Sequence, residues 1–252
     1  MTTQEAKFEY LLRLADSNLI LGHRLSEWCG HGPILEEDIA LINIALDFVG
    51  AATALYNYAA LVEAKGRTED DLAYMRDERD FRNLLITEQP NGDYAATIVR
   101  QFLFDAFSYY YYEALKSSKD ETIAAIAVKS HKEITYHLRH TTEWMYRLGD
   151  GTEESHERAQ NGLNDIWMFV SDLFDMDQVD EMLIKEGIAV DMNKIKAQWE
   201  AHVRSVIEKA TLVIPSTPFK QKGSREGKHS EHLGFLLAEM QYVHRAFPDA
   251  KW

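Results

Sequence analysis

Apolar residues recur every three or four positions along most of this chain, which is the period of an amphipathic helix. The pattern predicts four long helices, over residues 4–29, 34–65, 94–117 and 120–148. Glycine-containing turns follow three of them, with "CGHGP" after the first, Gly66 after the second and "GDG" after the fourth. Helices commonly end at such residues, so the turns support the predicted boundaries.

The connections divide these helices into two pairs. The links inside each pair are short, whereas "RTEDDLAYMRDERDFRNLL" and "EQPNGDY" separate the second helix from the third. We expect this longer connection to hold a short helix, an irregular stretch and a strong turn. Two pairs joined by one long connection are typical of a four-helix bundle with a single crossover.

Further helices are predicted after the bundle, at residues 153–174, 177–185, 192–212 and 229–246. The segment "VIPSTPFKQKGSREGKH" is rich in Pro, Gly and Lys and is expected to be a mobile or draped loop. We find no alternating strand pattern and no internal repeat. The sequence therefore predicts an all-α protein with a single domain over residues 1–252, a core bundle at about 4–148 and additional C-terminal helices at about 152–247.

The composition narrows the classes of partner. Hydrophobic residues make up 46% of the chain, and 27 Lys and Arg against 41 Asp and Glu give a net charge of −14. An acidic surface without a basic stripe repels phosphate, so nucleic acid and anionic membrane are not expected as partners. The N-terminus lacks a signal-peptide pattern, and no uninterrupted apolar run has the length of a membrane span, so a cytoplasmic location is expected.

Cys29 is the single cysteine. It therefore excludes an internal disulfide and a cysteine-based metal site. We expect it to be a small buried residue, because free cysteine usually is.

Each long helix carries a carboxylate in phase with its apolar positions, namely Asp16, Asp47, Asp105 and Glu133, and His137 shares a face with Glu133. On the second helix we expect the inward line to contain Ala40, Asn43, Asp47, Gly50 and Ala54. One carboxylate per helix resembles the di-iron carboxylate bundle, in which two helices supply a Glu and two supply a Glu-x-x-His pair.

The pattern departs from that site in three ways. Three of the carboxylates are Asp, Gly50 stands where His is required after Asp47, and Glu133 and His137 are four residues apart instead of three. Two interpretations remain open: a bound metal, or a metal-free polar network. In the network, buried carboxylates need cations or hydrogen bonds, and the nearby candidates are Arg24, Arg100, Lys129 and Lys132.

The stretch "GKHSEHLG" offers a second cluster of possible ligands. His229, Glu231 and His232 lie within four residues of each other. A helix that begins here with Ser230 as its N-cap is the alternative interpretation, and we favour it because Glu231 faces away from the two histidines.

Several longer stretches resemble one family nearly end to end. The segments "EWCGH", "EQPNG", "KEITYHLRHTTEWMYRLGDGTEES" and "EHLGFLLAEMQY" are similar to the C subunits of bacterial phenylacetyl-CoA epoxidases. The resemblance implies a ferritin-like four-helix bundle with additional C-terminal helices. It implies a degenerate di-iron site at Asp16, Asp47, Asp105, Glu133 and His137, without catalytic residues in this chain.

The resemblance also implies partners and cofactors. Such complexes are NADPH- and O2-dependent monooxygenases of phenylacetate degradation. The di-iron site lies in the catalytic A subunit, and flavin and an iron–sulfur cluster lie in a reductase subunit. This chain is expected to hold no cofactor and to act as the structural subunit, in a heterodimer with A that assembles further. In the absence of A, a homodimer is expected.

Two other functions stay open. The first is an autonomous di-iron carboxylate oxidase or oxygenase, which predicts iron bound by Asp16, Asp47, Asp105, Glu133 and His137. The second is a module that binds the acyl-CoA itself, although the sequence contains no phosphate-binding motif.

Overall fold

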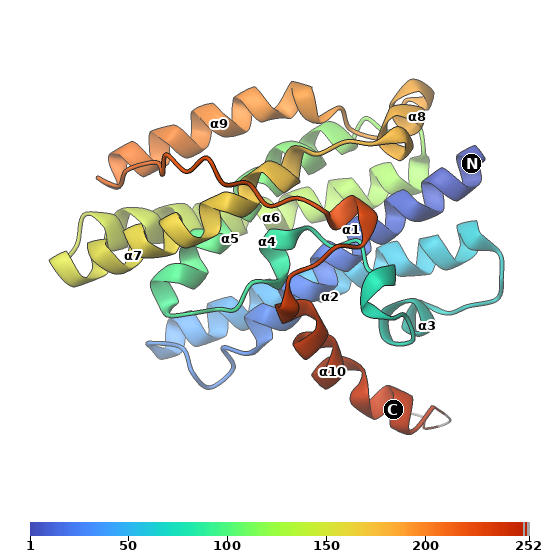
Figure 1. The fold of residues 1–252 in the computed structure, drawn as a ribbon, viewed down its shortest axis with the longest axis horizontal. Helices are drawn as coiled ribbons and strands as arrows, with labels where there is room; N and C mark the ends of the chain where they lie inside the picture. The colour runs from blue at the N-terminus through green and yellow to red at the C-terminus, as the bar shows by residue number, and fades with distance from the viewer. Residues whose placement is uncertain (249, 251–252) are drawn as a thin grey trace. The chain divides into compact units, whose positions relative to one another are not determined.

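The computed structural model describes residues 1–248 and 250, and it contains α- and 3₁₀-helices but no strand over that part of the chain (Figure 1). The all-α prediction is confirmed. The chain divides into two compact units, Met1–Pro90 with the residues from Gly223 onward, and Asn91–Lys222. The single domain over 1–252 stays a prediction, and its last positions, Asp249, Lys251 and Trp252, lie outside the described residues.

Unit 1 is built on a pair of long helices, α1 (Thr3–Ser26) and α2 (Leu35–Glu63). Thr2 caps α1 through a capping box with Glu5, which satisfies two backbone N–H groups at the start of the helix. The two helices approach closely at Gly22, where a Cβ atom would lie 2.9 Å from Val49 Cγ2. Both helices match the predicted ranges to within three residues at each end.

Four short elements and one longer helix complete unit 1. They are α3 (Glu69–Tyr74), the 3₁₀ helix η1 (Glu78–Asp80), α4 (Leu85–Glu88), η3 (Ser224–Glu226) and the longer α10 (Glu231–Ala246). The first three form the crossover connection that the sequence predicted as a short helix with irregular stretches. Helix α10 packs on it through a buried apolar cluster of Ile20, Phe81, Leu233, Leu236 and Leu237. The C-terminal helix is therefore part of the core of unit 1.

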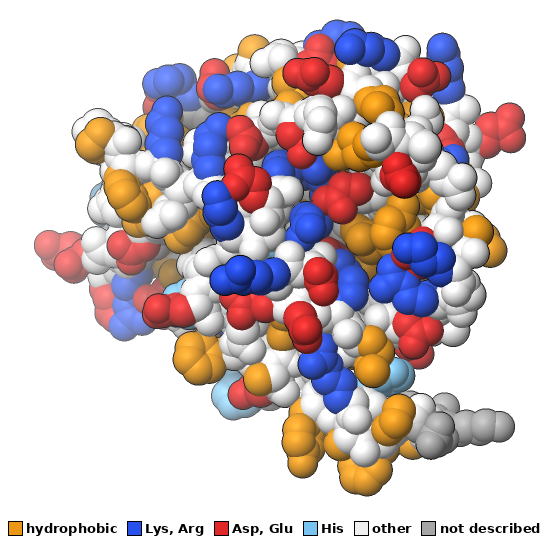
Figure 2. All heavy atoms as spheres, turned by 45° about the vertical axis from the view of Figure 1, so that its right-hand side comes forward, with side chains coloured by type: hydrophobic (Ala, Val, Ile, Leu, Met, Phe, Trp, Pro, Cys, Tyr) orange, Lys and Arg blue, Asp and Glu red, His pale blue; other side chains and the backbone are white. Residues whose placement is uncertain are grey.

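Large aromatic side chains are exposed on the outer side of α10 and just after its end. Phe235, Tyr242 and Phe247 are each at least 60% exposed. Figure 2 shows hydrophobic side chains gathered over this helix at the bottom of the view, whereas acidic and basic side chains are mixed over the rest of that face.

Unit 2 is built on a second long pair, α5 (Tyr94–Leu115) and α6 (Glu121–Gly149). It also contains α7 (Glu153–Ile166), η2 (Trp167–Phe174), α8 (Gln178–Glu186) and α9 (Met192–Lys209). The predicted helix over 153–174 changes to 3₁₀ geometry at Trp167. Two long helix pairs, in this order and with these lengths, agree with the ferritin-like prediction.

Two sequence-based expectations, the burial of Cys29 and the lack of an apolar run as long as a membrane span, can be compared with the structure of unit 1. Cys29 is exposed, so its predicted burial is wrong; it lies in the turn after α1 ends at Ser26. Helix α2 is, among the described residues, the one helix long and apolar enough to cross a membrane, and 44% of that apolar stretch is buried. Asp47 interrupts the stretch, and core helices of soluble proteins pass the same test.

Candidate functional site

Asp16 is the centre of a buried polar cluster in unit 1. Its side chain is fully buried in the middle of α1, and Tyr56 of α2 donates a hydrogen bond to its Oδ1 at 2.5 Å. The Arg76 guanidinium forms an ion pair with the same carboxylate, and the backbone N–H of Arg82 donates to Oδ2 at 2.7 Å. Both carboxylate oxygens are therefore occupied by protein donors.

The crossover connection holds Arg76 in place. Helix α3 ends just before it, and the Arg76 guanidinium donates to the carbonyl of Asp80 while lying 4.3 Å from the centre of the Phe81 ring. Burial lowers the pKa of Arg76, but the charge and hydrogen bond of Asp16 and the other acidic neighbours together raise it overall, so Arg76 stays cationic. Burial and the Asp16 carboxylate together raise the pKa of Tyr56, which stays a neutral donor.

Asp105 is the corresponding buried carboxylate of unit 2. It is fully buried in the middle of α5, where Gln101 Nε2 donates to its Oδ1 at 2.6 Å and Thr141 Oγ1 donates to its Oδ2 at 3.1 Å. Burial raises the pKa of Asp105 to about 7, although the nearby His137 and these two hydrogen bonds act to lower it. Among the described residues, no Lys or Arg forms an ion pair with Asp105.

His137 is confirmed as a buried residue of α6, with 1% of its surface exposed. The hydroxyl of Thr141 also contacts the backbone carbonyl of His137, at 3.0 Å, so Thr141 links His137 to Asp105. Thr141 is fully buried on the same face of α6, and the sequence pattern had not singled it out. Helical spacing could have indicated it, because Thr141 follows His137 by four residues and such residues lie on the same face of a helix.

The other two candidate carboxylates are less buried. On α2 the fully buried line contains Leu41, Phe48 and Leu55, whereas Asn43 is exposed and Asp47 is half-buried. The predicted inward line is therefore wrong in phase. Glu133 is also half-buried, and its carboxylate lies 3.7 Å from Nζ of the exposed Lys129.

Of the four cations proposed as internal partners, Lys129 forms an ion pair with a candidate carboxylate, that of Glu133, and it does so from an exposed position. Lys132 is exposed as well. Arg100 is buried and donates to the Asn91 side chain at 2.8 Å. Arg24 is buried and donates twice to the backbone carbonyl of Glu88, at 2.8 and 3.0 Å. The cation on Asp16 is Arg76, which the sequence analysis did not single out.

Glu88 forms a third buried cluster, in unit 1. Its side chain is fully buried and accepts hydrogen bonds from His229 Nδ1 at 2.8 Å, from Asn83 at 2.9 Å and from the backbone N–H of Ser230 at 2.5 Å. Burial lowers the pKa of His229, but the hydrogen bond and charge of Glu88 raise it overall. His229 is thus the partner of the Glu88 carboxylate, a contact that the stretch "GKHSEHLG" alone does not indicate.

Ser230 stands at the N-cap of α10, as the favoured interpretation of that stretch requires. Its side chain makes no capping hydrogen bond, and it contacts Gln89 Nε2 at 3.3 Å instead.

The residues of the candidate di-iron positions do not fit the metal. The Asp16 carboxylate is already bound by the Arg76 guanidinium and the Tyr56 hydroxyl. The Asp105 carboxylate accepts hydrogen bonds from two uncharged side chains. Gly50, where a His ligand is needed, has no side chain, and open space lies around its Cα. Over residues 1–248 and 250, no three His, Cys, Asp or Glu side chains are grouped so that they could hold a metal ion.

The comparisons with known proteins cover the chain almost from end to end. Residues 1–252 match the model of the family described as phenylacetic acid catabolic protein. The chain is 48% identical over 243 residues to the C subunit of 1,2-phenylacetyl-CoA epoxidase from Escherichia coli (strain K12), and the match covers 96% of this chain and 98% of that protein.

Proposed function

The chain belongs to the phenylacetic acid catabolic protein family, and we propose that it is the structural, non-catalytic C subunit of a phenylacetyl-CoA epoxidase. The similarity to the subunit of that name extends over nearly the full length of both chains, which supports the same place in an assembly. The observation that carries the non-catalytic role is the Arg76–Asp16 ion pair. A cation that occupies a candidate ligand competes directly with a metal ion for the same two oxygens.

In this proposal the chain's buried carboxylates stabilise the helix pairs. Asp16 connects α1 to α2 through Tyr56 and to the crossover connection through Arg76 and Arg82. Asp105 connects α5 to α6 through Thr141. Contacts of this kind fix the register of helices that apolar packing alone would hold less specifically.

The proposed partner is the catalytic A subunit of the same complex. We propose that A holds the di-iron site, that NADPH, flavin and an iron–sulfur cluster act through a reductase subunit, and that this chain holds no cofactor. The assembly would work in the cytoplasm. These roles extend the family resemblance to the complex as a whole.

Helix α2 supports a protein partner. Its side chains are apolar on most sides, and Leu35, Leu46 and Leu61 are 71%, 62% and 76% exposed. A helix that is apolar all round is normally covered, and a permanent interface with another protein is one way to cover it. We therefore propose that the exposed face of α2 contributes to the contact with A.

The test is co-expression with the A subunit, followed by co-purification and an epoxidation assay with and without this chain. We expect wild-type chain to co-purify with A, and Leu46→Glu with Leu61→Glu to abolish co-purification. Val128→Glu, which changes an exposed aliphatic residue on α6, is the matched control and should co-purify. Loss of A in both variants alike would contradict the role of α2.

Metal analysis separates the proposal from the autonomous oxidase. A di-iron enzyme would contain about two iron atoms per purified chain and would lose them in a Glu133→Ala variant. We expect the wild-type chain from iron-replete cells to contain far less than one.

A further inference from the structure

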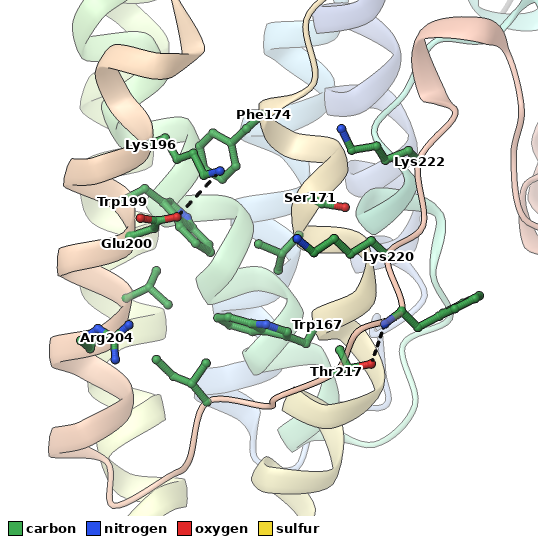
Figure 3. A pocket seen from close by; sticks show the side chains of 14 residues that line it. Trp167, Ser171, Phe174, Lys196, Trp199, Glu200, Arg204, Thr217, Lys220 and Lys222 are labelled. Carbon is green, nitrogen blue, oxygen red and sulfur yellow. Dashed lines mark hydrogen bonds and ion pairs between the residues drawn. The ribbon is translucent and has the colours of Figure 1, made fainter.

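Unit 2 contains a pocket between η2, α9 and the segment 214–222 (Figure 3). Its volume is about 340 Å³, at the lower end of the range of small-molecule sites, which is roughly 300–1,000 Å³. The pocket is open to solvent. Its size favours a compact ligand with one or two rings.

The walls of the pocket are aromatic. Trp199 of α9 and Trp167 of η2 have ring centres 6.3 Å apart, and Phe174 meets Trp199 edge to face at 5.2 Å. Trp199 is 2% exposed, and its Nε1 donates to the carbonyl of Leu103 at 3.1 Å. This hydrogen bond fixes the indole, and Trp199 in turn supports the half-buried rings of Trp167 and Phe174, which form the accessible aromatic surface of the pocket.

The segment 214–222 is fastened beside these rings at both ends. Gln160 bonds both backbone groups of Val213, at 2.8 and 2.9 Å, and the N–H of Gln221 donates to the carbonyl of Met168 at 2.9 Å. The rim that carries Lys220 and Lys222 is therefore held against η2, as Figure 3 shows.

The charge at the rim is opposite to that of the protein. Four cations, Lys196, Arg204, Lys220 and Lys222, line the pocket with one carboxylate, Glu200, although the chain as a whole carries a net charge of −14. Lys222 is paired with Asp175 at 2.5 Å, and Lys196 lies 3.9 Å from Glu200.

Arg204 and Lys220 form no ion pair within the part of the chain that the structure describes. Two cations without acidic partners, next to an aromatic wall, are complementary to a molecule with a flat apolar group and a negative end.

We propose that this pocket binds a small aromatic anion, with its ring against the half-buried Trp167, which Trp199 supports from the protein interior, and with its negative end facing the rim, where Arg204 and Lys220 lie on different sides of the pocket. The site is separate from the buried carboxylates and does not depend on the proposed structural role. Since the cations are exposed, binding should weaken as salt is added.

The experiment titrates the full-length chain with 2-naphthoate, followed by calorimetry and by tryptophan fluorescence. We expect saturable binding at one site, and about tenfold weaker binding of the uncharged 2-naphthamide. Arg204→Gln with Lys220→Gln should weaken naphthoate binding about tenfold or more, and Trp167→Leu should weaken both ligands.

Lys185→Gln is the matched control, because Lys185 is exposed on α8 outside the pocket. It should bind naphthoate as the wild type does. The proposal is overturned if naphthoate shows no saturable binding at low salt, if the amide binds equally well, or if Arg204→Gln with Lys220→Gln binds like the wild type. Circular dichroism melts confirm that each variant is folded.

Discussion

Asp16 and Asp105 occupy matching places in the two units and are stabilised in opposite ways. Each is fully buried in the middle of the first helix of a long pair. Asp16 is paired with a buried guanidinium, whereas Asp105 accepts hydrogen bonds from neutral groups and has a pKa raised to about 7. The difference shows that burial of a carboxylate can be offset by pairing the charge or by binding a proton.

The largest effect should come from breaking the charged pair. Asp16→Asn leaves the Arg76 guanidinium buried beside a neutral amide, and we expect a loss of about 3–5 kcal/mol in the free energy of unfolding. Urea denaturation of the full chain measures it. The double variant Asp16→Asn with Arg76→Met should recover much of this loss, because no unpaired charge remains. Equal loss in the single and double variants would contradict the ion-pair explanation.

The same substitution in unit 2 should have the opposite sign at alkaline pH. The folded-state pKa of Asp105, about 7, lies above the ordinary value of 3.8, so its contribution to stability is complete below pH 4 and is lost as the pH rises through 7. Asp105→Asn removes this loss. We expect the variant to be about 2–4 kcal/mol more stable than wild type at pH 8 and close to it at pH 4.

Unfolding curves from pH 4 to 8 give the difference between the two proteins, in which the titration of all other groups cancels to first order. A difference that does not change with pH would show that Asp105 stays ionised. In that case both units would bury a charged carboxylate, and the contrast between them would disappear.

A substitution of His229 tests whether Glu88, the second buried carboxylate of unit 1, is paired with a cation as Asp16 is. The pKa of His229 is raised, so the stability that it contributes with Glu88 is complete below about pH 6.5 and is lost as the pH rises through the higher folded value. We expect His229→Gln to cost about 1–2 kcal/mol at pH 6 and less at pH 9. Thermal melts at the two pH values measure this, and Lys185→Gln serves as the control. An equal cost at both would show that the charge of His229 does not change between them.

The smallest change should refine the description of Asp105. Thr141→Val removes one hydrogen bond at nearly constant volume, and we expect it to cost about 1 kcal/mol near neutral pH. Because this hydrogen bond lowers the pKa of Asp105, its loss should move the pH-dependent transition upward. A transition at the wild-type pH would mean that the Thr141 hydrogen bond does not influence the pKa of Asp105.

Local sequence patterns predicted the helices correctly. The site was predicted less well, because its polar partners are brought together by contacts between residues far apart in sequence. The boundaries of α1, α2, α5 and α6 follow from apolar spacing and caps, which lie within a few residues of each helix end. Helix α2 is apolar on nearly every side, so its sequence contains little information about which line is buried, and the line through Asp47 was the wrong one.

The polar partners could not be found by the same means. Arg76 is 60 residues from Asp16 in sequence, and His229 is 141 residues from Glu88. No periodicity relates such positions, because their contact depends on how the crossover connection and α10 pack in unit 1. Two partners of Asp105 were within reach of helical spacing: Gln101, four residues before it on α5, and Thr141, whose place on α6 follows from His137.

The contact between Glu88 and His229 also sets an order of events during protein synthesis. Unit 1 is discontinuous, since the whole of Asn91–Lys222 is translated between its two parts. At about 5–20 residues per second, the ribosome needs roughly 7–26 s to make that insertion. Over this interval the nascent chain carries Glu88 and the apolar face of Ile20 and Phe81 without the residues that cover them. Unit 2 can therefore fold first, and chaperones have a period in which to act on unit 1.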